Sequence, residues 1–267
     1  MIKINEKNQG VYFVEGHEKE IVDYINQNNI STIIFSYEHT NKDTEIGFLL
    51  KTKSVDSVII TSLIKIDLEI LYKLKIKKLL ISIGEYPIDF SKFSDLESVD
   101  LIYNKKMNFK KLSSSFKNLT IRKLKQKKID DCFDVNNITD LWIAQSDLIS
   151  LKGLSNFSNI EKIRVALSPK LVDISDLKYI SKSLKHLELD SCKLLSDFSV
   201  LEELTKIEEI SMYNVGDVLT TAYFKNLSQL KTLFLRGNTK VLNQNKQDVS
   251  HINKVVIADM DLMIGCQ

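Results

Sequence analysis

The chain has 267 residues, of which 43% are hydrophobic and 27% charged, with 37 Lys and Arg against 35 Asp and Glu. This composition indicates a folded protein with a large core, and its eight Gly and two Pro exclude collagen-like and Pro-rich linker sequences. The amino terminus has no apolar signal segment and charges break every apolar run well short of the ~18 residues of a membrane span, so we expect a cytoplasmic protein with no membrane partner.

The first 29 residues carry two kinds of local pattern. Alternating apolar residues up to Phe13 indicate one or two short strands, and residues 18–28 place Ile21 and Ile25 on one face of a helix. Because this segment does not share the pattern that follows it, we expect residues 1–29 to form a cap.

From residue 30 onward the chain repeats one unit eleven times, at intervals of about 22 residues. Each unit has the form apolar-x-x-apolar-x-apolar, which is typical of a short strand with one face inward, and the rest of the unit is long enough to return the chain to the next parallel strand. The units carry their apolar residues at Ile30/Ile33/Phe35, Val55/Val58/Ile60, Ile76/Leu79/Ile81, Leu96/Val99/Leu101, Phe116/Leu119/Ile121, Ile138/Leu141/Ile143, Ile160/Ile163/Val165, Leu184/Leu187/Leu189, Ile207/Ile210/Met212, Leu230/Leu233/Leu235 and Ile252/Val255/Ile257.

Two of the units follow the longer pattern L-x-x-L-x-L-x-x-N/C, beginning at Leu184 and Leu230, and a third, beginning at Leu96, follows it with Val99 in place of the second leucine. On these residues the chain resembles the leucine-rich repeat family over roughly residues 30–260. The resemblance implies an α/β leucine-rich repeat solenoid, or horseshoe, with a parallel concave sheet of about eleven strands and short helices or 3-10 turns on the convex side. We therefore expect residues 30–267, with a short carboxy-terminal tail, to form one continuous structural domain with the cap.

Two features of the repeats leave questions open. The family prefers Asn or Cys at a ladder position where this chain has residues such as Leu124, Ser146 and Val215, so we do not expect a continuous side-chain ladder. Apolar residues alternate in the tail from Met260 to Ile264, and they could add a final strand or contact a partner.

The sequence contains no motif for a cofactor, a metal or a disulfide framework. No two glycines have the G-x-G spacing of a phosphate loop, and the four histidines fall in unrelated units. The three cysteines, Cys132, Cys192 and Cys266, are far apart, and we expect Cys192 to be a small buried group. We therefore predict no cofactor and no metal site.

Charge is distributed unevenly along the repeats. Residues 105–128 contain ten basic residues and no acidic one, whereas residues 186–217 contain eight acidic residues and two lysines. These charges either solvate the convex face or steer a partner of opposite charge. Nucleic acid is an unlikely partner because Phe109 and Phe116 are the only aromatic residues within the basic run.

The residue between the last two apolar positions of each unit must point out of the concave sheet. In the first three units this residue is apolar, at Ile34, Ile59 and Leu80. Strands that are apolar on both faces are usually covered on both faces. We favour coverage by the amino-terminal segment or by residues 36–54 over a partner site.

From the fourth unit onward the outward residues are charged or aromatic. The only tryptophan, Trp142, is flanked by Arg122 and Arg164 in neighbouring units, and Trp, Tyr and Arg are the residue types most frequent at binding hot spots. Alternatively, Trp142 stacks on Arg164 and has no partner. We favour binding, and we predict a partner-binding site on the concave face made of Tyr103, Arg122, Trp142, Arg164, Glu188, Asp190, Tyr213, Phe234 and Arg236.

These patterns favour a non-enzymatic module that recognises a protein partner on its concave face. The resemblance implies the same class of function, and we consider a bacterial immunity or antitoxin-like protein, or alternatively the interaction domain of an effector. A less favoured alternative is an enzyme with an acid/base site in the concave groove, using Asp100, His186, Glu188 and Asp190.

Overall fold

The computed structural model describes residues 2–5, 9–110, 112–130 and 137–258. The chain divides into two compact units, Met1–Ile121 and Arg122–Gln267. The predicted tail residues Met260 to Ile264 lie outside the described residues, as do Cys132 and Cys266. That residues 30–267 form one continuous domain stays a prediction.

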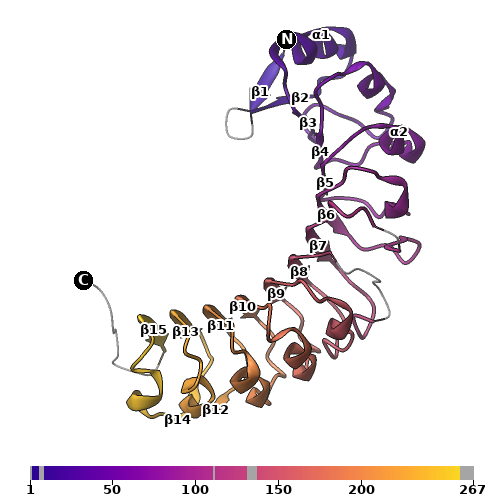
Figure 1. The fold of residues 1–267 in the computed structure, drawn as a ribbon. Helices are drawn as coiled ribbons and strands as arrows, with labels where there is room; N and C mark the ends of the chain where they lie inside the picture. Colours follow the sequence, from indigo (N-terminus) through magenta and orange to yellow (C-terminus); the bar gives the residue numbers. More distant parts are fainter. Residues whose placement is uncertain (1, 6–8, 111, 131–136, 259–267) are drawn as a thin grey trace. The chain divides into compact units, whose positions relative to one another are not determined.

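The first unit begins with an antiparallel hairpin of β1 (Lys3–Asn5) and β2 (Gly10–Tyr12), followed by α1 (Glu18–Asn28) (Figure 1). Parallel strands then follow in chain order, and β2 itself pairs with the first of them. The predicted cap therefore contributes a strand to the parallel sheet as well as closing its end. These strands are β3 (Thr32–Phe35), β4 (Ser57–Ile60), β5 (Lys78–Ile81), β6 (Ser98–Ile102) and β7 (Asn118–Arg122).

Short helical segments return the chain between the strands of the first unit. They are η1 (Gly47–Lys51), α2 (Leu68–Lys73) and η2 (Phe90–Lys92). Three rings, Phe13, Phe35 and Phe48, cluster beneath the cap, with centroids 5.2 Å apart between Phe13 and Phe35 and 5.1 Å apart between Phe13 and Phe48. Aromatic rings at this spacing bury large apolar areas, and they anchor the cap to the first repeats.

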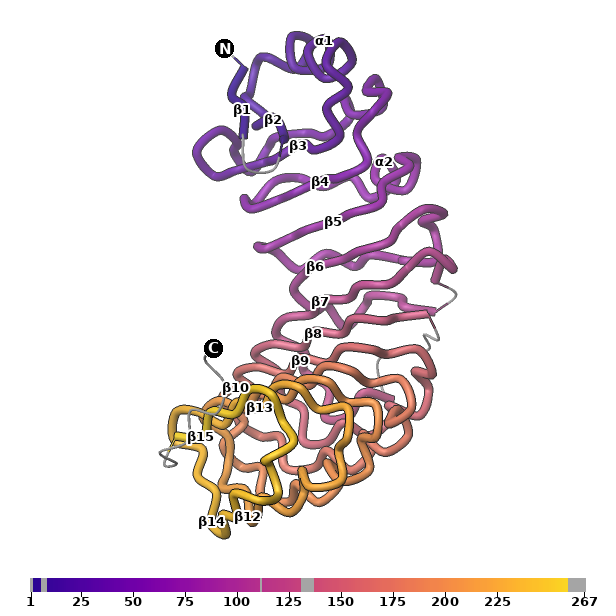
Figure 2. Tube along the Cα trace, turned by 60° about the vertical axis from the view of Figure 1, so that its left-hand side comes forward, coloured from indigo at the N-terminus to yellow at the C-terminus, as the bar shows by residue number. Residues whose placement is uncertain are grey.

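The second unit continues the same pattern with greater regularity. Its main strands are parallel and aligned residue by residue. The trace in Figure 2 passes through β8, β9 and β10 in chain order. They are β8 (Asp140–Ala144), β9 (Lys162–Ala166), β10 (His186–Asp190), β11 (Glu209–Tyr213), β13 (Thr232–Arg236) and β15 (Lys254–Ile257). One 3-10 turn lies between each consecutive pair of these strands: η3 (Leu154–Asn156), η4 (Ser175–Ile180), η5 (Ser199–Glu203), η6 (Thr221–Phe224) and η7 (Lys246–Val249).

A second, two-stranded parallel sheet lies on the opposite side of this unit from β11 and β13 (Figure 1). It consists of β12 (Val218–Thr220) and β14 (Val241–Asn243).

The apolar positions of the repeat form the core, as the sequence predicts. In the second unit the central apolar residue of every strand is at most 1% exposed, and these residues stack in register from strand to strand: Leu141, Ile163, Leu187, Ile210, Leu233 and Val255. Each repeat buries its apolar residues against the neighbouring repeats, which is how repeat proteins build one extended core.

The residue after β7 and after each main strand of the second unit except β15 has a left-handed backbone. At Leu167, for example, φ is 51°, and the Leu167 amide donates a hydrogen bond to the carbonyl of Asp190 at 2.9 Å. This conformation ends the strand, and the amide of the residue that adopts it still donates a hydrogen bond to the next repeat. It recurs at Lys123, Gln145, Ser191, Asn214 and Gly237.

Serine hydroxyl groups partly replace the side-chain ladder of the family. Ser146 and Ser168 are both buried, and their hydroxyl oxygens lie 2.6 Å apart. Cys192 occupies the next position, and its thiol donates to the backbone carbonyls of Val165 and Asp190. The prediction that the ladder is not a continuous row of Asn is therefore consistent with these contacts.

Candidate protein-binding face

The second unit presents a grid of side chains on the side of its main sheet that faces away from the return segments. We call this side the outer face; it corresponds to the concave face of the sequence analysis. It consists of three columns that cross the strands, and neighbours within a column lie about 4.8 Å apart. The first column is Asp140, Lys162, His186, Glu209, Thr232 and Lys254; the middle column is Trp142, Arg164, Glu188, Ser211, Phe234 and Val256; the third is Ala144, Ala166, Asp190, Tyr213 and Arg236.

Trp142 lies at the β8 end of this face and is half-buried. The guanidinium carbon of Arg164 lies 4.6 Å from the centre of the Trp142 ring, and Arg164 Nη2 donates to both carboxylate oxygens of Asp140 at 3.1 and 3.2 Å. The stack that the sequence analysis offers as an alternative is thus present. It holds the tryptophan and the arginine in one arrangement before any partner arrives, which lowers the entropy lost on binding.

A second cation–aromatic cluster lies at the other end of the face. Arg236 places its guanidinium carbon 4.1 Å from the centre of the Phe234 ring, and the Lys254 ammonium lies 5.1 Å from the same point. Phe234 is half-buried and both cations are exposed. This cluster joins an apolar surface to two positive charges.

Acidic residues separate the two clusters. Glu188 is exposed, and Asp190, two residues further along β10, accepts a hydrogen bond from the Ser191 hydroxyl at 2.8 Å. His186 Nδ1 lies 3.6 Å from a carboxylate oxygen of Glu209. Tyr213, which is 48% exposed, lies between Asp190 and Arg236 in the third column. The face therefore alternates aromatic, acidic and aromatic regions along its length.

The structure brings seven of the nine predicted site residues together on the outer face. These are Trp142, Arg164, Glu188, Asp190, Tyr213, Phe234 and Arg236. Arg122 is the last residue of β7, and the next amide, that of Lys123, donates to the carbonyl of Ala144 at 3.0 Å. Arg122 therefore lies at the Trp142 end of the face.

The structure does not support the predicted role of Tyr103 in the binding site. It belongs to the first unit and is only 8% exposed, so it offers almost no surface to a partner. In the second unit the residue after each main strand from β8 to β13 has a positive φ, but Tyr103, which follows β6, does not. Because the backbone lacks that turn, the column predicted from the repeat does not extend to Tyr103.

The apolar outward residues of the first unit differ from one another in exposure. Ile34 is 4% exposed, and its neighbour across the strands is Tyr12, whose ring meets that of His39 edge-on at 5.7 Å. The expected coverage by the chain itself is present at Ile34. Ile59 and Leu80 remain half-buried, so this coverage ends after the first repeat.

The sequence analysis missed an apolar row on the return segments of the second unit. Leu194, Leu219 and Leu242 are 56%, 50% and 59% exposed, and with Tyr223 they line a hollow of about 560 Å³. Leu219 and Leu242 are neighbours across β12 and β14. The signal was present as an apolar residue eight positions after the start of β10 and ten positions after the starts of β11 and β13, positions that the repeat pattern does not include.

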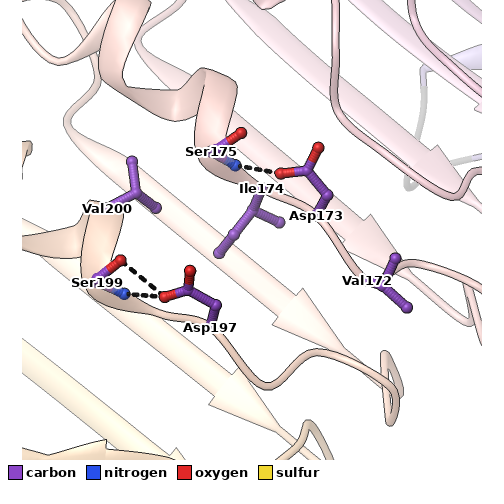
Figure 3. A pocket seen from close by; sticks show the side chains of 7 residues that line it. All are labelled: Val172, Asp173, Ile174, Ser175, Asp197, Ser199 and Val200. Carbon is purple, nitrogen blue, oxygen red and sulfur yellow. Dashed lines mark hydrogen bonds between the residues drawn. The ribbon is translucent and has the colours of Figure 1, made fainter.

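A smaller hollow of about 230 Å³ separates two neighbouring repeats (Figure 3). Its two carboxylates begin the turns η4 and η5, where Asp173 accepts from the Ser175 amide at 2.9 Å and Asp197 from the Ser199 amide at 2.9 Å. Burial alone would raise the pKa of Asp173, but hydrogen bonds from Ser150 and Ser175 bring it below its usual value. These carboxylates therefore hold the backbone that leads into the two turns.

The described residues contain no group of three or more His, Cys, Asp or Glu side chains placed to hold a metal ion. In the parts of the chain that the structure describes, no helix is both long and apolar enough to cross a membrane.

No family model and no curated protein sequence matches the chain. Among solved structures it is similar to an internalin from Listeria monocytogenes, with a TM-score of 0.63 and 16% sequence identity over 91% of this chain and 71% of that one. Together with the repeats and their strand order, this similarity shows the fold. The chain has the leucine-rich repeat fold, and the eleven predicted strands are β3 to β11, β13 and β15.

Proposed function

We propose that this chain is a protein-recognition module whose principal binding surface is the outer face of the second unit. The observation that carries the proposal is the Trp142–Arg164 stack, an aromatic anchor on an open sheet, in one row with Phe234. Half-exposed Trp, Tyr and Phe held by arginines are the usual composition of a binding hot spot, and a soluble surface has little reason to expose them.

The leucine-rich repeat fold adds general support, since a rigid parallel sheet presents many side chains to one partner. An immunity or antitoxin-like role of the chain, an effector setting and a cytoplasmic location stay predictions from the sequence. The acid/base alternative has less support, because His186 contacts Glu209 as an exposed pair and Asp100 belongs to the other unit.

Site-specific photocrosslinking in the source cell tests this function. A photoreactive residue at Ser211, in the centre of the outer face, should capture one protein in good yield. The same residue at Ser228, which is exposed on a return segment, serves as the control. A protein captured at Ser228 and not at Ser211 would contradict the proposal.

A further inference from the structure

The charges of the outer face fall into a paired set and an unpaired set. Arg164 is bonded to Asp140, and His186 contacts Glu209. Among the described residues, by contrast, no acidic side chain lies within 4.0 Å of the Arg236 or Lys254 cations, and no basic side chain lies that close to the carboxylates of Glu188 or Asp190. Among the described residues, the face thus presents two cations and two anions that form no ion pair within 4.0 Å.

The two unpaired cations share one aromatic ring. Since they lie 4.1 and 5.1 Å from the centre of Phe234, they are at most about 9 Å apart, a distance similar to the Debye length of about 8 Å at physiological salt. Like charges at this distance repel each other, and a carboxylate placed above Phe234 would pair with both. This end of the face therefore suits an acidic side chain.

The two unpaired anions share one strand. Glu188 and Asp190 are two residues apart on β10, so their side chains point to the same side of the sheet. A partner ammonium or guanidinium group between them would relieve their mutual repulsion. This middle region suits a basic side chain.

The spacing of these regions decides between partner conformations. From β10 to β13 there are two strand spacings, about 10 Å. In a helix, residues seven positions apart are separated by about 10.5 Å along the axis and lie on the same side. In an extended chain, residues about three positions apart are separated by about 10 Å, and they point to opposite sides. A helix lying across the strands therefore matches both charges, and an extended segment does not.

The same interval recurs toward the other end of the face. From β10 back to β8, where Trp142 lies, there are again two strand spacings. We infer that the partner docks a helix across the outer face with an apolar, a basic and an acidic side chain at successive intervals of seven residues, over Trp142, over Glu188 and Asp190, and over the Arg236–Lys254 pair. This inference rests on the proposed function of the same face.

Selection from a displayed library of single helices, randomised at three positions seven residues apart, tests the inference on the purified full chain. Among clones whose binding is lost on Trp142→Ala, the three randomised positions should be enriched for an apolar, a basic and an acidic residue, with the basic residue in the middle. The apolar residue can come first or last, because the helix can lie in either direction. On the variant Arg236→Glu/Lys254→Glu the acidic position should change to Lys or Arg, and helices selected on the wild type should bind about tenfold more weakly or worse.

The matched control is Lys193→Glu/Lys240→Glu, which makes the same charge change at exposed residues outside the face. It should leave the selected pattern unchanged. The inference would be overturned if the Trp142-dependent clones showed no charge preference, or if their preference stayed the same after the charge reversal at Arg236 and Lys254. Either result would still be compatible with the proposed binding face. Absence of any Trp142-dependent helix would also overturn it, and crosslinking at Ser211 would then decide the proposed function separately.

Discussion

Leu167 holds a backbone conformation that leucine disfavours. Its φ of 51° is fixed because its amide bonds to the carbonyl of Asp190, and its side chain is 49% exposed. Asparagine tolerates this conformation at lower cost, so Leu167→Asn should raise the free energy of unfolding by about 0.5–1 kcal/mol. Urea denaturation measures the change. Leu194→Asn is the control, since Leu194 is similarly exposed but has no positive φ; equal effects of the two substitutions would contradict the explanation.

The thiol of Cys192 should make the free energy of unfolding depend on pH in the alkaline range. Burial raises the pKa of its thiol from 9.0 to about 11. The folded protein therefore holds the proton more tightly than the unfolded chain, so the contribution is complete below pH 9 and is lost as the pH rises toward 11. The stability difference between wild type and Cys192→Ala should fall by roughly 2 kcal/mol across that interval. A difference that stays constant with pH would show that the thiol is not buried in this way.

The 3-10 turns are the elements whose starts depend on single side chains. Asp197 accepts hydrogen bonds from the Ser199 hydroxyl at 2.7 Å and from the Ser199 amide, and these bonds lower the pKa of its carboxyl. Asp197→Ala should cost about 1 kcal/mol at neutral pH, whereas Asp197→Asn keeps an acceptor and should cost less. Because the folded-state pKa is lowered, the advantage of wild type over Asp197→Ala should shrink as the pH falls below 3.8. Chemical denaturation at pH 7 and pH 3 measures both effects, and equal losses for Ala and Asn would argue against the cap.

The strands were predictable because each carries its own local signal. Alternation across a triplet such as Leu187-Glu188-Leu189 assigns both the strand and its two faces, and eleven repetitions fix the parallel order. The pairing of β2 with β3 was not predictable, because three residues, Gly10–Tyr12, carry too little pattern to show a partner. Four of the six left-handed turns were also hidden, since Lys, Gln, Leu and Ser occupy them, and only Asn214 and Gly237 are of the residue types that favour this conformation.

The candidate site follows from the same alternation where the repeat is regular. Trp142, Arg164 and Phe234 lie on the face that the sequence assigns them to, because their strands share one register. Tyr103 fails because it lies beyond the end of a strand, where the direction of a side chain depends on the backbone turn and not on alternation. Which charges pair with one another depends on rotamers, and the sequence contains no information on them.

At the scale of the whole molecule, stability should spread from repeat to repeat. Leu187 is 1% exposed in the core of β10, and Leu187→Ala should cost about 2–5 kcal/mol by leaving a cavity. Since each repeat is supported only by its neighbours, amide hydrogen exchange should also accelerate in β9 and β11. Faster exchange confined to β10, or a change below about 0.5 kcal/mol, would contradict the shared core.

The central claim is that the outer face of the second unit binds a protein through Trp142. Its most direct test is the dissociation constant of the Ser211-crosslinked protein, once purified, for wild type, for Trp142→Ala and for Tyr179→Ala. Tyr179 is a matched control, since it is 58% exposed, lies 5.2 Å from the Lys178 ammonium and belongs to a return turn.

Trp142→Ala should weaken binding by about thirtyfold or more, the loss typical of a hot-spot residue, and should leave the melting temperature within a few degrees. Tyr179→Ala should bind as wild type does. Unchanged binding by a folded Trp142→Ala protein, or unfolding of that variant, would contradict the account.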